Sequence, residues 1–144
     1  MVNQIREYAV IFRKAIQSMP MSEFPKSLYF DRFPRGCCGD TSKLFSKFLS
    51  SKGIKAYYVW GIRDDEYSHA WLEHDDIIID LTADQFEEVH EEVIVTKYRD
   101  WHSQFEIQNK VALDFEEFNE YNAKRLGAIY KNILNKINEE CMKN

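Results

Sequence analysis

Residues 35–40, RGCCGD, place two adjacent cysteines between glycines and end on an acid. The apolar pattern of a helix begins here, and a cysteine in the first turn of a helix ionises more easily because free N–H groups and the helix dipole favour an anion. Gly36 and Gly39 leave room for a substrate backbone to approach. We therefore expect Cys38 to be a reactive thiol and Cys37 to be a small buried hydrophobic residue.

A second stretch, residues 68–86 (SHAWLEHDDIIIDLTADQF), supplies a histidine and a carboxylate. A hairpin whose turn is centred between His74 and Asp75 places His69 directly opposite Asp80, with Cβ atoms about 5 Å apart. A carboxylate beside an imidazole fixes its tautomer and stabilises its positive form. The pair could therefore activate a thiol for nucleophilic attack, provided that the fold brings Cys38 to it.

The alternation of apolar and polar residues along this hairpin supports that pairing. One face would carry Ala70, Leu72, Ile77, Ile79 and Leu81. The other face would carry His69, Trp71, Ile78 and Asp80. A shift of one residue would move Asp80 to the apolar face, which the cost of burying a carboxylate opposes.

The elements that must position these residues follow from periodicity. Apolar residues at helical spacing predict helices over residues 3–18, over 38–52 and from 114 onward. Runs rich in β-branched and aromatic residues predict strands over 54–62, 67–74, 76–82 and 91–98. The segment 20–36 holds all three prolines and no clear period, so it should be an irregular connection. This order, helix, antiparallel hairpins and helix, is typical of the α+β class.

Length and charge restrict the class of protein. The 144 residues suit a single domain spanning residues 1–144. The net charge of −5 argues against a nucleic-acid partner, which needs a basic patch. No apolar run approaches the ~18 residues of a membrane span, and the first residues are interrupted by charge, unlike a signal peptide. We expect a cytoplasmic protein that does not bind membranes.

The cysteines and acids do not suggest a metal or a disulfide framework. Cys37, Cys38 and Cys141 are an odd set, and a bond between neighbouring cysteines is strained. Adjacent cysteines also point apart, whereas zinc ligands are usually spaced by two to four residues. We expect Cys141 to be incidental and the protein to need no cofactor and no metal. Four acids should form a solvated stretch: Glu87, Glu88, Glu91 and Glu92.

Three segments together resemble a known family. RGCCGDTSKLFSKFLSSKGIKAYYVWG, then SHAWLE, then IIIDLT, are similar to the core of the transglutaminase-like branch of the papain-like cysteine enzymes. That branch has a glycine before a cysteine, an acid two residues later, a helix ending at Gly-Ile, a strand ending in glycine, His-Ala-Trp, and an Asp on the next strand. The resemblance covers residues 34–86 and implies a nucleophile helix packed on a small antiparallel sheet.

The resemblance also implies roles for individual residues. Cys38 lies 15 residues before Gly53, and it is therefore Cys38 and not Cys37 that takes the nucleophile position. His69 takes the position of the base, Asp80 that of the orienting acid and Asp40 that of the acid after the cysteine. Without the family, Asp40 is a favourable acid in a first helical turn.

The activity that the resemblance implies is acyl transfer through a thioester. We expect hydrolysis of an amide bond in a peptide or protein, as a peptidase or a deamidase. A transglutaminase or acyltransferase that passes the acyl group to an amine is the alternative; arylamine acetyl transfer is a weaker one, because those enzymes are much longer. A non-catalytic protein-binding module that retains the fold is the rival class.

One departure from the family concerns the oxyanion hole. Papain-like peptidases carry a glutamine shortly before the cysteine, but residues 30–35 contain no amide side chain. The Cys38 N–H can be one donor, and Gln85 is a candidate for the second. Trp71 and Trp60 should lie in the core or in the cleft wall, where they would contact a substrate. We expect the other histidines to lie at the surface: His74, in the hairpin turn, His90 and His102.

Overall fold

A computed structural model describes residues 1–20, 22, 32–112 and 120–142. Its helices are α1 (Val2–Ser18), α2 (Cys38–Ser51) and α3 (Glu120–Met142), with short 3₁₀ turns η4 (Ala83–Gln85) and η5 (His102–Gln104). Its strands are β1 (Tyr57–Ile62), β2 (Ser68–His74), β3 (Ile77–Asp80), β4 (Ile94–Thr96) and β5 (Glu106–Val111). The predicted α+β class is confirmed. Most of the predicted irregular connection, and the start of the predicted last helix, lie outside the described residues.

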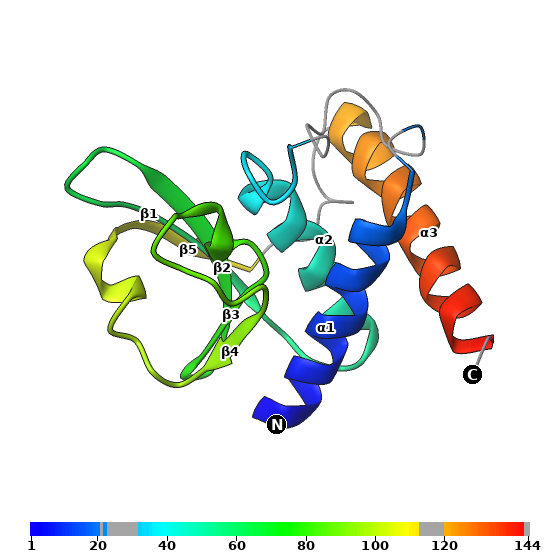
Figure 1. The fold of residues 1–144 in the computed structure, drawn as a ribbon, viewed down its shortest axis with the longest axis horizontal. Helices are drawn as coiled ribbons and strands as arrows, with labels where there is room; N and C mark the ends of the chain where they lie inside the picture. Colours follow the sequence, from blue (N-terminus) through cyan, green and yellow to red (C-terminus); the bar gives the residue numbers. More distant parts are fainter. Residues whose placement is uncertain (21, 23–31, 113–119, 143–144) are drawn as a thin grey trace.

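The five strands form one antiparallel sheet in the order β4-β3-β2-β1-β5. Helices α1 and α2 lie against one face of this sheet and α3 packs on their outer side, while η5 and the loops around it lie at the other side of the sheet (Figure 1). The catalytic candidates of the sequence come from three neighbouring elements, α2, β2 and β3. Within the described residues, no helix has the length and apolar character needed to cross a membrane.

The main core fills the space between the sheet and the helices. It joins apolar residues of α1, α2 and α3 to the inner face of the hairpin, where Leu72, Ile77, Ile79 and Leu81 lie as predicted. A second, smaller cluster lies on the opposite face and consists of Val59, Trp71, Ile78, Phe86 and Phe105. The predicted assignment of residues to the two faces of the hairpin is therefore confirmed.

Two glycines define the helix that carries Cys38. Gly36 has a φ of 73°, which an L side chain rarely adopts, and it turns the chain just before α2 begins. Gly53, with a φ of 77°, ends the helix after Lys52, and the Ile54 N–H bonds the Leu49 carbonyl at 2.9 Å. The predicted helix over 38–52 is thus confirmed, with Cys38 as its first residue.

The predicted register of the hairpin is wrong by two residues. The structure pairs Leu72 with Ile79 and His74 with Ile77, so the turn consists of Asp75 and Asp76. A two-residue shift leaves every side chain on its predicted face, because the period of a strand is two. His69 and Asp80 are consequently diagonal neighbours on one face and not directly opposed.

Strand β5 was not predicted, because it is an exposed edge strand with no alternation of apolar and polar residues. It pairs with β1 through an irregularity between Trp60 and Gly61. A Cβ at Gly61 would lie 2.7 Å from the Glu106 carbonyl oxygen and 3.0 Å from the Phe105 Cβ. Only glycine therefore allows this close approach, which brings Phe105 over the face that carries His69.

Candidate active site

The structure separates the two adjacent cysteines. Cys37 is fully buried in the main core, and its thiol donates to the Arg35 carbonyl at 3.2 Å. Cys38, the first residue of α2, is half-buried, and its thiol is close enough to the His69 side chain and the Ala70 backbone for both groups to lower its pKa. The thiol at the imidazole is therefore that of Cys38.

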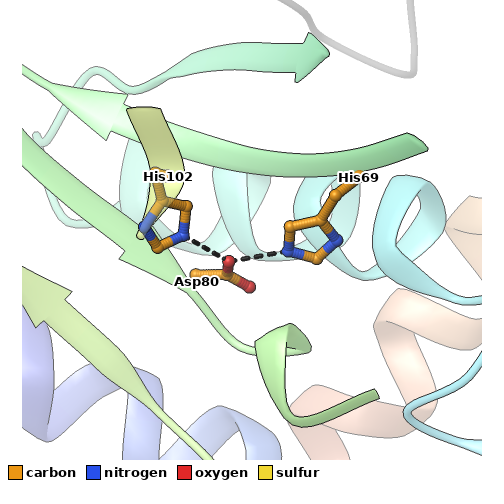
Figure 2. Close-up of side chains that lie close together, drawn as sticks. All are labelled: His69, Asp80 and His102. Atoms are coloured by element: carbon orange, nitrogen blue, oxygen red, sulfur yellow. Dashed lines mark hydrogen bonds and ion pairs between the residues drawn. The ribbon is translucent and has the colours of Figure 1, made fainter. Parts of the chain in front are cut away.

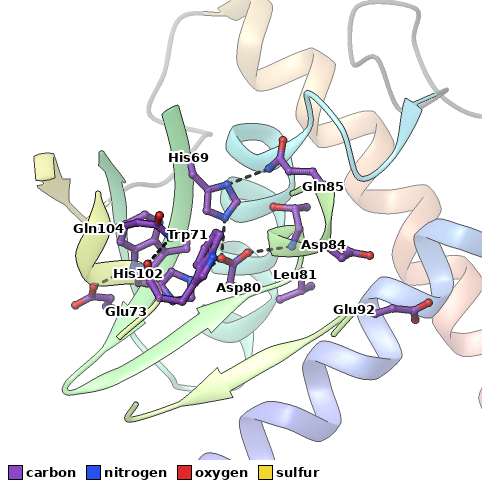
Figure 3. Close-up of polar contacts among 12 residues, drawn as sticks. His69, Trp71, Glu73, Asp80, Leu81, Asp84, Gln85, Glu92, His102 and Gln104 are labelled. Atoms are coloured by element: carbon purple, nitrogen blue, oxygen red, sulfur yellow. Dashed lines mark hydrogen bonds and ion pairs between the residues drawn. The ribbon is translucent and has the colours of Figure 1, made fainter. Parts of the chain in front are cut away.

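His69 contacts a carboxylate through its other side. Its Nε2 lies 2.7 Å from Asp80 Oδ2, and neither side chain is exposed to solvent. Figure 3 shows His69 between Asp80 and Gln85, whose amide nitrogen lies 3.0 Å from Nδ1. Since Asp80 engages Nε2, Nδ1 is the nitrogen that remains for the thiol, and it also contacts the Gln85 amide. Cys38, His69 and Asp80 thus form a continuous row.

His102, which the sequence analysis placed at the surface, is instead buried next to this row. Its side chain is only 3% exposed, and its Nε2 lies 2.7 Å from the same Asp80 Oδ2 that contacts His69 (Figure 2). The second carboxylate oxygen of Asp80 accepts the Thr82 N–H at 3.0 Å. Local sequence gives no signal for this arrangement, because His102 lies in a short 3₁₀ turn after the last predicted strand.

Charge coupling in the row favours a thiolate and an imidazolium. Burial raises the pKa of the Cys38 thiol, but the hydrogen bond and charge of His69 outweigh burial and place this pKa below its ordinary value. Burial lowers the pKa of His69, but the charge and hydrogen bond of Asp80 outweigh it and raise the pKa to about 9. Burial likewise opposes ionisation of Asp80, but the two histidines hold its pKa well below the usual range.

The group His69, Asp80 and His102 has the composition of a metal site, with three ligand atoms within 4.8 Å of one another. Its distances are nevertheless those of hydrogen bonds. Each Nε2 is 2.7 Å from Oδ2, whereas ligands at about 2.0–2.1 Å from a tetrahedral zinc ion lie roughly 3.3 Å apart. Each histidine is therefore bonded directly to Asp80, and an ion would have to separate it from the carboxylate.

Gln85, a predicted candidate of the site, is held near His69 by a buried arginine of α1. Arg13 forms a two-point ion pair with Asp84 at 2.6 and 2.7 Å. It also donates to the Leu81 and Glu92 carbonyls at 2.8 and 2.6 Å. The amide of Gln85 can serve both states of the base: its NH₂ donates to neutral Nδ1, and after a half turn its oxygen accepts from the imidazolium.

The two tryptophans differ in their access to a ligand. Trp71 is 1% exposed, belongs to the second cluster and donates to Glu73 at 3.0 Å. Of its two expected places, the core and the cleft wall, it therefore occupies the core, and the expected substrate contact is not available to it. Trp60 is half-buried and pairs with Ala70, whose backbone helps to lower the pKa of the Cys38 thiol.

Tyr58 of β1 is a neighbour of the thiol that the sequence analysis did not single out. A Cβ at Gly39 would lie 3.3 Å from its hydroxyl. Burial, followed by the charges of Cys38 and Asp40, raises the pKa of Tyr58 to about 12, so the hydroxyl stays a donor at neutral pH. Asp40 itself accepts two hydrogen bonds from Arg125 of α3, at 3.0 and 3.2 Å.

A cleft of about 540 Å³ opens beside the row. Ser68 and Gln85 connect the cleft to His69, since one precedes it in β2 and the other bonds its Nδ1. The arginine Arg63 in the cleft is paired with Asp65 and Glu88, each at 2.8 Å. The described residues that line the cleft are Arg35, Arg63, Tyr67, Ser68, Gln85, Phe86, Glu87 and Glu88.

The remaining expectations concern residues away from the row. His90 is exposed, as predicted. His74 is the last residue of β2 and not part of the turn, and its Nδ1 lies 2.6 Å from the Lys55 carbonyl oxygen. The expected solvated acids are confirmed as exposed at Glu87, Glu88, Glu91 and Glu92. The side chain of Cys141 lies outside the described part of the chain.

Comparison with known proteins gives no match: no family model, no curated protein and no solved structure matches the chain.

Proposed function

We propose that the protein is a thiol-dependent acyl-transfer enzyme with a papain-like, transglutaminase-like core and the triad Cys38, His69 and Asp80. One observation carries the proposal: the thiol at the first position of α2 lies beside an imidazole that lowers its pKa, and the Nε2 of this imidazole bonds a buried carboxylate. Nucleophilic acyl transfer requires a nucleophile, a base beside it and an acid that orients the base.

The first half of the reaction forms a thioester. The Cys38 thiolate attacks the acyl carbon of an amide, and the carbonyl electrons move to the oxygen. As the C–N bond breaks, the Nδ1–H of the His69 imidazolium transfers its proton to the departing nitrogen, which leaves as an amine or ammonia. Asp80 stabilises the imidazolium until this transfer and keeps its Nε2 protonated throughout.

The second half releases the acyl group. Neutral His69 accepts a proton from water as the water oxygen attacks the thioester, and the C–S bond then breaks to give a carboxylic acid and the thiolate. An amine in place of water would give a new amide, which is the transglutaminase or acyltransferase outcome. We favour hydrolysis of a peptide or protein amide, because the resemblance includes small bacterial peptidases.

Stabilisation of the oxyanion requires two hydrogen-bond donors. Cys38 follows the N-cap residue Cys37, so its N–H has no partner within α2 and can donate to a substrate oxygen. Two side chains near the thiol can supply the second donor. Gln85 has its amide at His69, and Tyr58 has its hydroxyl at the start of α2.

Alkylation with iodoacetamide, followed by mass mapping, tests the proposal. Cys38 should react near neutral pH much faster than Cys37, which is buried, and faster than Cys141. Equal rates for Cys38 and Cys141 would contradict an activated thiol. A glutamine peptide, assayed for ammonia release and for uptake of a labelled amine, then separates hydrolysis from transfer.

A protein-binding module that retains the fold without catalysis is the alternative. It is favoured by the composition of the cleft, whose lining includes neither Cys38 nor His69. A module would bind peptides equally well after Cys38→Ala and would release no product, whereas the enzyme would form a covalent adduct with a peptide electrophile only when Cys38 is present.

A further inference from the structure

Asp80 has two imidazole partners, although a nucleophilic triad needs only one. Its Oδ2 lies 2.7 Å from Nε2 of both His69 and His102, as Figure 2 shows. The two histidines approach from different elements, β2 and η5, and all three side chains are buried. The triad therefore does not account for the contact between His102 and Asp80.

We propose that His102 is a positioning residue that acts through Asp80 on the pair formed by Cys38 and His69. This inference rests on the proposed acyl-transfer site. His102 does not touch the thiol; it holds the carboxylate that orients the base. Without the His102 N–H, Asp80 would lose one of the hydrogen bonds that fix its orientation. A displaced carboxylate would then displace the His69 imidazole relative to the Cys38 thiol.

The hydrogen-bond geometry explains how the carboxylate is fixed. Thr82 donates its N–H to Oδ1 at 3.0 Å, and His102 donates to Oδ2, so each oxygen has an anchor besides the base. Two anchors on different oxygens prevent rotation about the bond to the carboxyl group. Asp80 can then present Oδ2 to His69 in a single orientation.

His102 is itself held rigidly. Its ring meets that of Trp71 at a centroid distance of 4.9 Å and that of Trp101 at 4.8 Å, both edge to face. An ionised carboxylate only accepts hydrogen bonds, so Nε2 of His102 must carry a hydrogen. The neutral Nε2–H tautomer satisfies this requirement, and no second positive charge is needed beside the imidazolium.

The test compares two replacements of the same residue. His102→Phe keeps a planar ring but has no donor, whereas His102→Gln keeps an N–H donor. The exposed His90 provides the control His90→Phe. The rate constant for alkylation of Cys38 by iodoacetamide is measured at pH 7, at a temperature at which melting curves show each variant folded.

We expect His102→Phe to slow alkylation roughly tenfold, the low end of the 10–100-fold cost seen when a partner that orients a metal-bound histidine is lost. His102→Gln should recover most of the rate, and His90→Phe should not change it. A wild-type rate in His102→Phe, or equal losses in the Phe and Gln variants, would overturn the proposal, because lost packing alone is not rescued by a donor.

Proton NMR of protein labelled with ¹⁵N-histidine gives a readout that needs neither thiol reactivity nor turnover. The wild-type protein should show two low-field Nε2–H signals, from His69 and His102. His102→Gln should remove one signal and leave the other nearly unmoved, whereas His102→Phe should shift the His69 signal. A single low-field signal in the wild type would overturn the inference even if His102→Phe fails to fold.

The two readouts separate failure of this inference from failure of the proposed function. If Cys38 alkylates rapidly in the wild type and in His102→Phe, the inference fails and the enzyme remains. If Cys38 is unreactive in the wild type, the proposed function fails, and the His69 signal in His102→Phe then decides whether His102 orients the base.

Discussion

The two faces of the sheet differ in what they bury. The face toward the helices packs mainly aliphatic and phenylalanine side chains, and the helices also bury a few polar groups such as Arg13 of α1 and Ser46 of α2. The opposite face buries His69, Asp80 and His102 among aromatic rings and is covered by loops and short 3₁₀ turns. We call the side of the sheet toward α1 and α2 the helix face and the opposite side the loop face. Apolar burial on the helix face stabilises the fold, which allows the loop face to hold ionisable groups away from water.

The largest expected effect comes from removing the thiol. Cys38→Ala should abolish turnover and covalent labelling while the fold survives, because only a small side chain at a helix start is lost. His69→Ala should lower turnover by roughly 10²–10⁴, the usual contribution of general acid–base catalysis. Turnover of a peptide amide and thermal melting should be measured on both variants. Full activity of Cys38→Ala would remove the functional distinction between the two faces.

A cavity on the helix face should affect stability alone. Ile133 of α3 is fully buried in the main core, so Ile133→Ala should lower the free energy of unfolding by about 2–5 kcal/mol. Alkylation of Cys38 should keep its wild-type rate at temperatures where the variant is folded. If urea titration shows that the Ala variant is unfolded, Ile133→Val provides the milder step. A parallel loss of thiol reactivity in a fully folded variant would mean that the faces are coupled.

On the loop face, Asp80→Asn should change both properties. The amide oxygen can accept from only one of the two Nε2–H groups well, and it does not stabilise the imidazolium. Turnover should fall about 100-fold, less than for His69→Ala, and stability should fall by about 1–3 kcal/mol because a buried donor loses its partner. Asp75→Asn is the matched control, since Asp75 is exposed and its φ of 51° suits asparagine. Equal effects of the two variants would contradict the assigned role of Asp80.

The pH dependence should differ between alkylation and turnover. Alkylation should rise with pH through the lowered pKa of Cys38, at a lower pH than for an ordinary thiol, and then stay high. Turnover should follow the same acid limb but fall near pH 9, because the pKa of His69 is about 9 and the neutral imidazole cannot protonate the leaving amine. In His69→Ala the pH at which alkylation rises should increase toward the ordinary pKa of a cysteine thiol, because the imidazole that lowers the pKa of Cys38 is gone. Rates measured from pH 5 to 10 with both assays check this, and parallel curves would argue against His69 as the acid.

The smallest expected effect is that of the neighbouring cysteine. Cys37→Ala should leave turnover nearly unchanged and cost about 1 kcal/mol of stability through lost packing in the main core. Activity assays and melting of this variant should be run beside Cys38→Ala. Loss of activity in Cys37→Ala alone would show that the count from Gly53 identified the wrong cysteine.

The sequence predicted the helix face well, because its elements carry strong periodicity. The limits of α1 and α2, the three strands of the hairpins and the assignment of residues such as Leu72 and Ile79 all follow from apolar spacing. The register error has a definite cause. Turns centred at 74–75 and at 75–76 give the same alternation, and only the positive φ of Asp75 distinguishes them.

The loop face was predicted only along the hairpin. Its alternation placed His69, Trp71, Ile78 and Asp80 on one face, whereas β5 and the burial of His102 were not predicted. An edge strand with mostly exposed residues has no apolar pattern, and the contact of His102 with Asp80 depends on how the chain folds back after β4. Tyr58 was missed for a similar reason, since its proximity to the thiol arises from packing of β1 against α2.

The burial of Cys37 also determines how the protein should respond to oxidants. Peroxide converts a thiolate to a sulfenic acid, which many redox-regulated proteins rescue by forming a disulfide with a nearby resolving cysteine. Cys37 cannot serve in this way, because its side chain lies in the core with the thiol bonded to the Arg35 carbonyl, and a ring between neighbouring cysteines is strained. Of the two cysteines whose side chains the structure describes, Cys37 therefore cannot resolve a sulfenic acid on Cys38, and we expect Cys37→Ala to leave the recovery of oxidised Cys38 by added thiols unchanged.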